Sequence, residues 1–92
     1  MSETKHTRLV VVKNPNGLHA RPADLLVKLA TKYSANIFIV KGYERVDAKS
    51  ILGILTLAAT EGTELSIEAD GSDAAAAVEA LTELVSSTFG EE

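Results

Sequence analysis

The sequence predicts an α+β protein, a two-layer open-faced sandwich in which a four-stranded sheet carries three helices on one face. Some segments alternate between polar and apolar residues or contain short runs of β-branched residues, as strands do, and others have apolar residues at helical spacing. Along the chain these segments follow the order β-α-β-β-α-β-α. The chain of 92 residues suffices for one small core, and it shows no repeat, linker or low-complexity segment. We therefore expect residues 1–92 to form a single domain.

The first strand and the first helix are predicted in the N-terminal third. Residues 7–13 include three consecutive valines, which favour a strand, and Asn-Pro-Asn-Gly at 14–17 is a turn-forming run. Residues 20–33 are predicted to form a helix, because apolar side chains recur there at helical spacing. This stripe consists of Ala23, Leu26, Val27, Ala30 and either Tyr33 or Ser34.

The middle of the chain is predicted to hold a hairpin and a short helix. Consecutive apolar residues mark a strand at 36–41, the pair 42–43 makes a tight turn, and 44–47 returns as a short strand. Residues 50–59 are predicted to form a short helix, with Gly62 as the residue that caps its C-terminal end.

The last third is predicted to hold one strand and one helix. Residues 64–69 alternate between polar and apolar, which is typical of a strand with one buried face. Residues 70–73 turn the chain and cap a final helix that runs to about residue 89, and the tail at 90–92 is expected to fray. The side chains of this helix that should face the core are Ala74, Ala77, Val78, Leu81, Leu84 and Val85.

Composition excludes several classes of protein. The chain has no cysteine, so it has neither a disulfide framework nor a thiolate metal site. His6 has no second ligand at metal spacing, so we expect no metal and no cofactor. There is no charged-then-apolar leader and no apolar run as long as a membrane span. We expect a soluble, cytoplasmic protein that does not insert into a membrane.

Charge is distributed unevenly along the chain. Residues 1–50 carry all nine basic residues and four acidic ones, a net +5, whereas residues 51–92 carry nine acidic residues, a net −9. The basic half suits an anionic group or an acidic partner, unless the two halves interleave in space and their fields partly cancel. The total of −4 and the unclustered aromatic residues argue against nucleic-acid binding.

The segment at 17–23, Gly-Leu-His-Ala-Arg-Pro-Ala, is the most specific motif of the chain. Gly17 allows a sharp bend, and Pro22 fits the first turn of a helix. His19 should therefore lie at the helix start, where unpaired backbone N–H groups and the helix dipole favour an anion. Because a neutral imidazole is also a nucleophile near neutral pH, this arrangement favours a histidine that carries a phosphoryl group.

The two residues that follow the histidine, Ala20 and Arg21, are expected to stabilise the phosphoryl group. The backbone N–H groups of Ala20 and Arg21 are placed to hold phosphate oxygens, and the Arg21 guanidinium adds a planar donor fork. The plainer alternative is a surface or capping histidine with an arginine that forms a salt bridge.

The segment from Ser50 to Thr60 contains no charged residue. Ser50 is a good N-cap residue, and this role alone explains it without any regulation. The stripe expected to face the core consists of Ile54, Leu57 and Ala58. The other apolar residues should form an exposed patch, typical of a partner site: Ile51, Leu52 and Leu55. The alternative is a helix that is buried all round.

The chain resembles the HPr family, the histidine-containing phosphocarriers of the bacterial phosphoenolpyruvate-dependent sugar phosphotransferase system. The resemblance rests on the motif at 17–23, on Lys-Ser-Ile-Leu-Gly-Ile at 49–54, and on the element order over essentially the whole chain. It implies an antiparallel sheet with strand order 1-4-2-3. It also implies that enzyme I delivers a phosphoryl group to Nδ1 of His19, and that a IIA domain removes it. Both partners would dock on the helix at 50–59, and the protein would be a carrier rather than an enzyme.

In one branch of the family, an HPr kinase/phosphorylase modifies the serine that matches Ser50, and a catabolite-control transcription regulator is then a further partner. Leu52 and Leu55 stand where that branch commonly has methionines. Two other readings stay open: a regulatory paralogue of the nitrogen-related or catabolite-control type that acts by binding, and an unrelated small α/β interaction domain. Nothing in the sequence demands more than a monomer.

Overall fold

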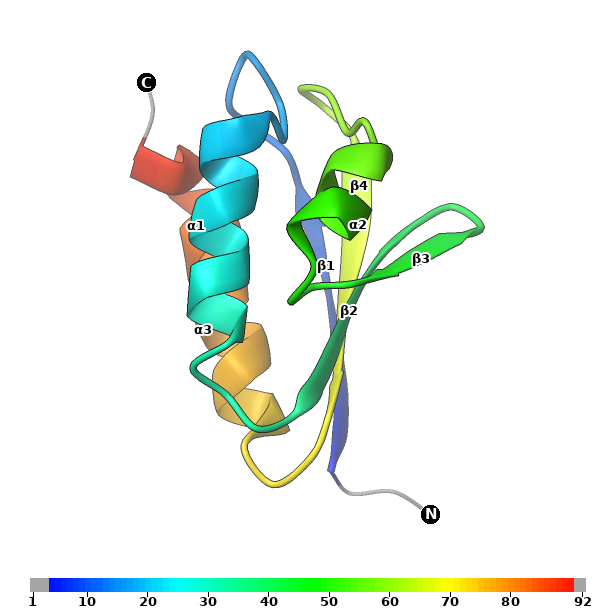
Figure 1. The fold of residues 1–92 in the computed structure, drawn as a ribbon, viewed down its shortest axis with the longest axis vertical. Helices are drawn as coiled ribbons and strands as arrows, with labels where there is room; N and C mark the ends of the chain where they lie inside the picture. Colours follow the sequence, from blue (N-terminus) through cyan, green and yellow to red (C-terminus); the bar gives the residue numbers. More distant parts are fainter. Residues whose placement is uncertain (1–3, 91–92) are drawn as a thin grey trace.

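Four strands form one sheet in the order β1-β4-β2-β3, and each neighbouring pair is antiparallel. The structure is a computed structural model, and it describes residues 4–90. The elements follow the chain as β1 (Lys5–Val11), α1 (Ala20–Ala30), β2 (Asn36–Lys41), β3 (Glu44–Asp47), α2 (Ile51–Thr56), β4 (Glu64–Asp70) and α3 (Ala74–Ser86), with a 3-10 turn at Thr88–Gly90 (Figure 1).

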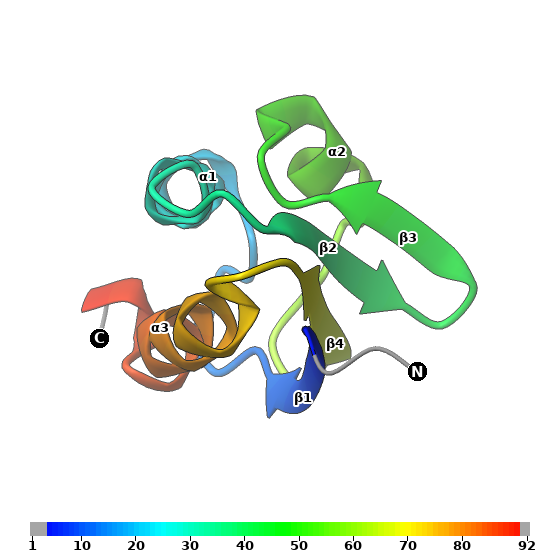
Figure 2. The ribbon, with the colours of Figure 1, turned by 90° about the horizontal axis from the view of Figure 1, so that it is seen from below.

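The helices lie on one side of the sheet, and the other face of the sheet is open (Figure 2). The predicted open-faced sandwich and its β-α-β-β-α-β-α order are confirmed, and so is the strand order 1-4-2-3. β4 comes from the acidic half of the chain and lies between β1 and β2 of the basic half. Arg45 and Glu68 form an ion pair of 3.2 Å across these halves, so the two fields partly cancel.

The core fills the space between the sheet and the helices. In β4, Leu65, Ile67 and Ala69 are buried while the residues between them are not, as the alternation at 64–69 predicts. Each helix adds a fully buried side chain, such as Leu26, Ile54 and Leu81. Burial of one such side chain contributes about 1.5–3 kcal/mol, so these contacts hold the helices against the sheet.

Two boundaries in the N-terminal third differ from the prediction. β1 covers Lys5–Val11 instead of residues 7–13, because its extent follows its pairing with β4, from Lys5 opposite Asp70 to Val11 opposite Glu64. α1 ends at Ala30 instead of residue 33. The following N–H groups form shorter-range bonds, such as the 3.1 Å bond from Lys32 to the Leu29 carbonyl, which tighten the last turn.

The second helix is shorter than predicted. α2 ends at Thr56 instead of residue 59, and Ala58 has a φ of 50°, which a right-handed helix cannot continue. Ala58 is therefore exposed instead of facing the core, and Ala59 is buried. Gly62 does not cap α2. It belongs to the turn before β4, where its N–H donates to the Val12 carbonyl at 2.7 Å.

Asp73 is the N-cap residue of α3, but its side chain serves another part of the fold. It makes no capping hydrogen bond to α3. Its two carboxylate oxygens instead accept the backbone N–H groups of Ser34 and Ala35, each at 2.8 Å. The donated bond from Ser34 is the main reason that the pKa of Asp73 lies below its usual range. Asp73 thus ties the start of α3 to the loop between α1 and β2.

The C-terminal end of α3 differs slightly from the prediction. α3 ends at Ser86, and the 3-10 turn follows, in which Phe89 has a φ of 56° and is buried. Leu84 is half-buried, whereas the other five residues expected to face the core are buried. Gly90 belongs to the 3-10 turn, and residues 91–92 of the predicted frayed tail lie outside the described residues.

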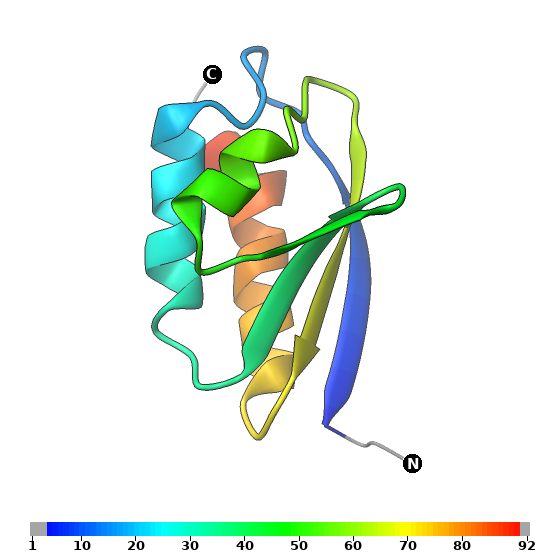
Figure 3. The same cartoon turned by 45° about the vertical axis from the view of Figure 1, so that its right-hand side comes forward.

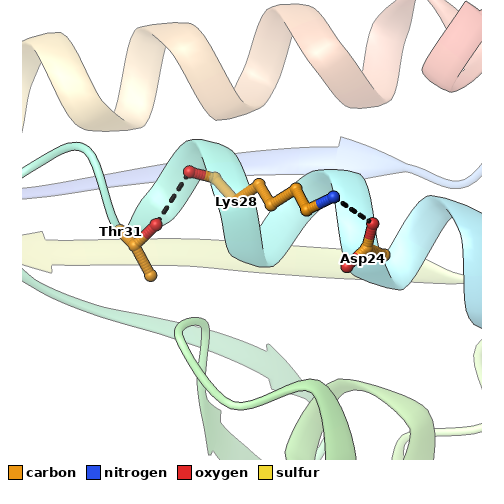
Figure 4. Close-up of polar contacts among 3 residues, drawn as sticks. All are labelled: Asp24, Lys28 and Thr31. Carbon is orange, nitrogen blue, oxygen red and sulfur yellow. Dashed lines mark hydrogen bonds and ion pairs between the residues drawn. The ribbon is translucent and has the colours of Figure 1, made fainter.

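The outer face of α1 is polar. Figure 4 shows Asp24 and Lys28 one turn apart, with the carboxylate oxygen 3.0 Å from Nζ. The Thr31 hydroxyl donates to the Lys28 carbonyl at 2.9 Å and satisfies one of the last carbonyl groups of the helix. Because an exposed i,i+4 pair stabilises a helix by only about 0.3–0.5 kcal/mol, α1 is held mainly by its buried stripe.

Candidate functional site

His19 is the N-cap residue of α1. Its backbone is extended, with φ of −80° and ψ of −170°, and its side chain makes no capping hydrogen bond. The residue is half-buried, and its carbonyl accepts the N–H of Ala23 at 3.0 Å, the first bond of the helix. The prediction that His19 lies at the start of the helix is confirmed.

Two backbone N–H groups follow His19 at the start of α1, those of Ala20 and Arg21. The N–H groups in the first turn of a helix have no intrahelical acceptors. Pro22 has no N–H group, and that of Ala23 donates to the His19 carbonyl. Ala20 and Arg21 therefore supply the donors at this end, where the helix dipole adds partial positive charge. Both residues are exposed.

The loop before His19 approaches the chain beyond α2 closely. Gly17 has a φ of 66°, and its N–H donates to the Asn14 carbonyl at 3.0 Å. The N–H of Leu18 donates to the Ala59 carbonyl at 2.9 Å. A Cβ on Gly17 would overlap the Ala59 carbonyl oxygen and lie 2.9 Å from Cα of Thr60, so a larger residue does not fit here.

This contact fixes α2 relative to His19. The start of α1 and the C-terminal end of α2 lie at the same end of the molecule (Figures 1 and 3). The Nζ of Lys41 donates to the Leu57 carbonyl at 2.7 Å and satisfies a carbonyl group at the end of α2. A side-chain bond from Lys41 of β2 and a main-chain bond from the His19 loop therefore both hold the segment that ends α2.

The side chain of the N-cap residue closes the N-terminal end of α2. Ser50 is the N-cap residue, and its half-buried hydroxyl accepts the N–H of Gly53 at 3.1 Å. Gly53 lies close to β3, since a Cβ there would be 3.2 Å from Cβ of Val46. The capping role predicted for Ser50 is confirmed.

The outer side of α2 is apolar and exposed. The exposed fractions are 37% for Ile51, 73% for Leu52 and 36% for Leu55, whereas Ile54 and Leu57 are fully buried. The structure therefore excludes a helix that is buried all round. We call Ile51, Leu52 and Leu55 the α2 patch. Contiguous exposed apolar groups are typical of protein contacts.

Other candidate features lie apart from His19. His6 is exposed on β1 and lines a hollow of about 460 Å³ between β1 and α3. Within residues 4–90, no group of three or more His, Cys, Asp or Glu side chains is arranged to hold a metal ion. No helix in this described part is both long enough and apolar enough to cross a membrane.

The family model described as "PTS HPr component phosphorylation site" matches residues 6–87. The chain belongs to the HPr family. The phosphocarrier protein HPr of Neisseria meningitidis is 39% identical over 82 residues, which are 89% of this chain and 92% of that protein. The family places the chain in the phosphotransferase system, as the two motifs indicated.

Solved HPr structures show the same fold. The crystal structure of HPr-C-His from Thermoanaerobacter tengcongensis matches with a TM-score of 0.91 and 42% identity, over 95% of this chain and 98% of that one. The phosphocarrier protein HPr from Bacillus anthracis matches with a TM-score of 0.86 and 44% identity, over 90% and 99%. The match to the family model at residues 6–87 includes the His19 loop and α2.

Sequence reasoning missed two groups at the site. It identified Asn14 as part of a turn, but the residue is fully buried and its Nδ2 donates to the Gly17 carbonyl at 2.6 Å. Asn14 directly follows the segment 7–13 that was predicted as a strand, and a polar residue that becomes buried there needs a partner. Ala59 has no comparable signal, because its role depends on a main-chain contact between distant parts of the chain.

Proposed function

We propose that His19 accepts a phosphoryl group from phosphorylated enzyme I and passes it to IIA domains. The observation that carries this proposal is the open start of α1, where the His19 side chain is not used as a cap and the N–H groups of Ala20 and Arg21 remain as donors. These donors and the helix dipole stabilise phosphate oxygens. The exposed Arg21 guanidinium adds a planar fork suited to phosphate.

In the transfer step, the lone pair on Nδ1 of His19 attacks phosphorus while the proton stays on Nε2. The bond between phosphorus and its donor atom on enzyme I breaks, and that atom keeps the electron pair. The step needs little covalent help from the protein, so positioning and charge stabilisation set its rate. The nitrogen–phosphorus bond breaks in turn when a nucleophile of a IIA domain attacks the same phosphorus.

We propose the α2 patch as the surface on which enzyme I and IIA domains dock. The support is its exposure and its place on a helix whose end is bonded to the His19 loop. A partner that covers the patch therefore lies beside the acceptor. The protein acts in the cytoplasm as a monomeric substrate of enzyme I, with no turnover and no cofactor of its own.

Incubation with phosphoenolpyruvate and purified enzyme I tests the carrier proposal. We expect the wild type and His6→Ala to become phosphorylated and His19→Ala to stay unmodified, with similar melting temperatures for all three. His6 is the matched control, because it is the other histidine and is exposed. Phosphorylation of His19→Ala would overturn the proposal. A wild type that binds enzyme I without being phosphorylated would instead indicate a regulatory paralogue.

We also propose Ser50 as a regulatory site for an HPr kinase/phosphorylase. The support is its position at the start of α2, directly before Ile51 and Leu52 of the α2 patch. A phosphate adds a charge of about −1.5 to −2, which the helix start tolerates but an acidic partner repels. The modified protein would lose affinity for enzyme I and become a ligand of a catabolite-control transcription regulator.

The kinase assay decides this second proposal separately. Incubation with an HPr kinase and ATP, followed by mass mapping, should label Ser50 in the wild type and leave Ser50→Ala unlabelled. The labelled protein should accept phosphate from enzyme I more slowly than the unlabelled one. Absence of label on Ser50 removes the claim and leaves the residue with its capping role.

A further inference from the structure

We infer that Asn14 is a positioning residue for His19, and that its buried side-chain amide sets the orientation of the peptide unit that leads into the acceptor. This inference rests on the proposed phosphoryl transfer at His19. It concerns the hydrogen bonds between Asn14 and Gly17, and it assigns Asn14 no contact with the phosphoryl group.

The burial of Asn14 needs an explanation. Within residues 4–90, Asn14 is the one polar residue that is buried, with an exposed fraction of 0%. A buried amide is unfavourable unless it is hydrogen-bonded, whereas an apolar residue at this position would have no such requirement. The Nδ2 of Asn14 donates to the Gly17 carbonyl at 2.6 Å, which satisfies the nitrogen of the amide, whereas its buried Oδ1 accepts no hydrogen bond. The interaction is short and lies out of water, so it constrains the Gly17 carbonyl strongly.

The peptide unit between Gly17 and Leu18 is held at both of its polar atoms. Its carbonyl oxygen accepts from Asn14 Nδ2 at 2.6 Å, and its N–H donates to the Ala59 carbonyl at 2.9 Å. The N–H of Gly17 adds a 3.0 Å bond to the Asn14 carbonyl. The plane of this peptide unit is therefore fixed from opposite sides, one residue before His19.

We call these two bonds, from Asn14 Nδ2 and to the Ala59 carbonyl, the clamp. The flexibility of Gly17 makes the clamp necessary. Gly17 already adopts a φ of 66°, and a residue without Cβ changes φ and ψ more freely than any other. Rotation of the peptide unit would turn the Leu18 side chain out of the core and change the direction in which His19 is presented. The amide of Asn14 opposes that rotation at the carbonyl, and Ala59 opposes it at the N–H.

Orientation matters because transfer depends on placement of the attacking nitrogen. A displacement of about 1 Å in a reacting group costs on the order of 100-fold in rate. Loss of the clamp should therefore lower kcat for phosphorylation by enzyme I. It should leave KM for the carrier close to the wild-type value, because Asn14 lies outside the α2 patch.

The test compares Asn14→Ala and Asn14→Leu with the wild type and with Ile37→Val. Ile37→Val loses core packing at the start of β2, at the end of the sheet away from the His19 loop (Figure 1), and controls for lost stability. Asn14→Leu keeps the branching at Cγ and fills the site without a donor, so it stays informative if Asn14→Ala folds poorly. Hydrogen exchange at the Leu18 amide, followed by NMR, reports the clamp without any phosphoryl transfer.

We expect both Asn14 variants to exchange the Leu18 amide at least about tenfold faster than the wild type, and to be phosphorylated about 10- to 100-fold more slowly through kcat. The control should match the wild type in both. Wild-type exchange at Leu18, or a transfer rate no lower than that of Ile37→Val, would overturn the inference. A wild type that takes no phosphate from enzyme I would refute the proposed function instead, while the exchange result would still report the clamp.

Discussion

The starts of α1 and α2 have similar backbones and opposite uses of the N-cap side chain. His19 and Ser50 are both extended, with φ of −80° and −113°. The Ser50 hydroxyl accepts the N–H of Gly53 at 3.1 Å and closes its helix. The His19 side chain makes no capping bond, so the first-turn donors of α1 are left for another group. Of these two helix starts, only that of α1 is therefore a candidate anion site.

The start of α3 is a third solution. Asp73 does not cap its own helix, and it binds the N–H groups of Ser34 and Ala35 in a distant loop. One N-cap side chain thus stabilises its helix, one ties two segments together, and one, that of His19, makes no capping bond. Substitutions that exchange these uses test whether the comparison holds.

The largest expected effect comes from transplanting the α2 cap onto α1. His19→Ser supplies a hydroxyl at the open helix start and removes the nucleophile. We predict complete loss of phosphoryl transfer from enzyme I, together with a gain in the free energy of unfolding of up to about 1 kcal/mol. Transfer assays and urea unfolding measure the two quantities. Residual phosphorylation of this variant would place the acceptor elsewhere.

The two sides of α2 should respond in opposite ways. Ile54→Ala removes a fully buried side chain and should lower the free energy of unfolding by about 2–5 kcal/mol. Leu52→Glu alters a side chain that is 73% exposed and should slow transfer by raising KM for the carrier, with little change in melting temperature. Leu9→Glu, on the open face of the sheet at 64% exposure, is the matched control and should transfer normally. A large stability loss in Leu52→Glu would contradict the assignment.

Removal of the N-cap side chain should change the free energy of unfolding by different amounts at the two helix starts. Ser50→Ala loses the bond to Gly53 and should lower the free energy of unfolding by about 1 kcal/mol. His19→Ala loses no capping bond and should lower the free energy of unfolding by less than Ser50→Ala does. Thermal unfolding at neutral pH measures both. Equal losses in the two variants would mean that the histidine also closes its helix.

The smallest effect is expected at acid pH. The N–H donors of Ser34 and Ala35 lower the pKa of Asp73, so the folded state favours the carboxylate. The resulting stability is present above the ordinary carboxyl pKa and is lost as pH falls through the lowered value. Asp73→Asn should therefore show a flatter dependence of unfolding free energy on pH in this acid range. Asp24→Asn, in an exposed pair on α1, should keep the wild-type slope.

Local patterns predicted most of this fold. The hairpin of β2 and β3 was predicted residue by residue, because its apolar run, glycine turn and return strand are all local signals. The C-terminal ends of α1 and α2 were not predicted correctly. That of α1 depends on the tightened last turn, and that of α2 depends on the positive φ of Ala58. The role of Asp73 also escaped prediction, because its acceptor groups serve residues far away in the chain.

The site was predicted in outline. The positions of His19 and Ser50 at helix starts, and the exposure of the α2 patch, followed from motif and spacing. The clamp of Asn14 and Ala59 on the peptide unit before His19 could not be predicted from motif or spacing. It arises from a contact between the loop before α1 and the chain after α2, and such a contact leaves no periodic signal in the sequence.

The central claim is that the ring of His19 is the phosphoryl acceptor. NMR of protein labelled with ¹⁵N, recorded before and after incubation with enzyme I and phosphoenolpyruvate, observes the ring nitrogens of both histidines directly. We predict that one ring nitrogen of His19, Nδ1, acquires a bond to phosphorus while both nitrogens of His6 keep their signals. Modification of His6, or unchanged ring signals in a protein that has taken up phosphate, would contradict it.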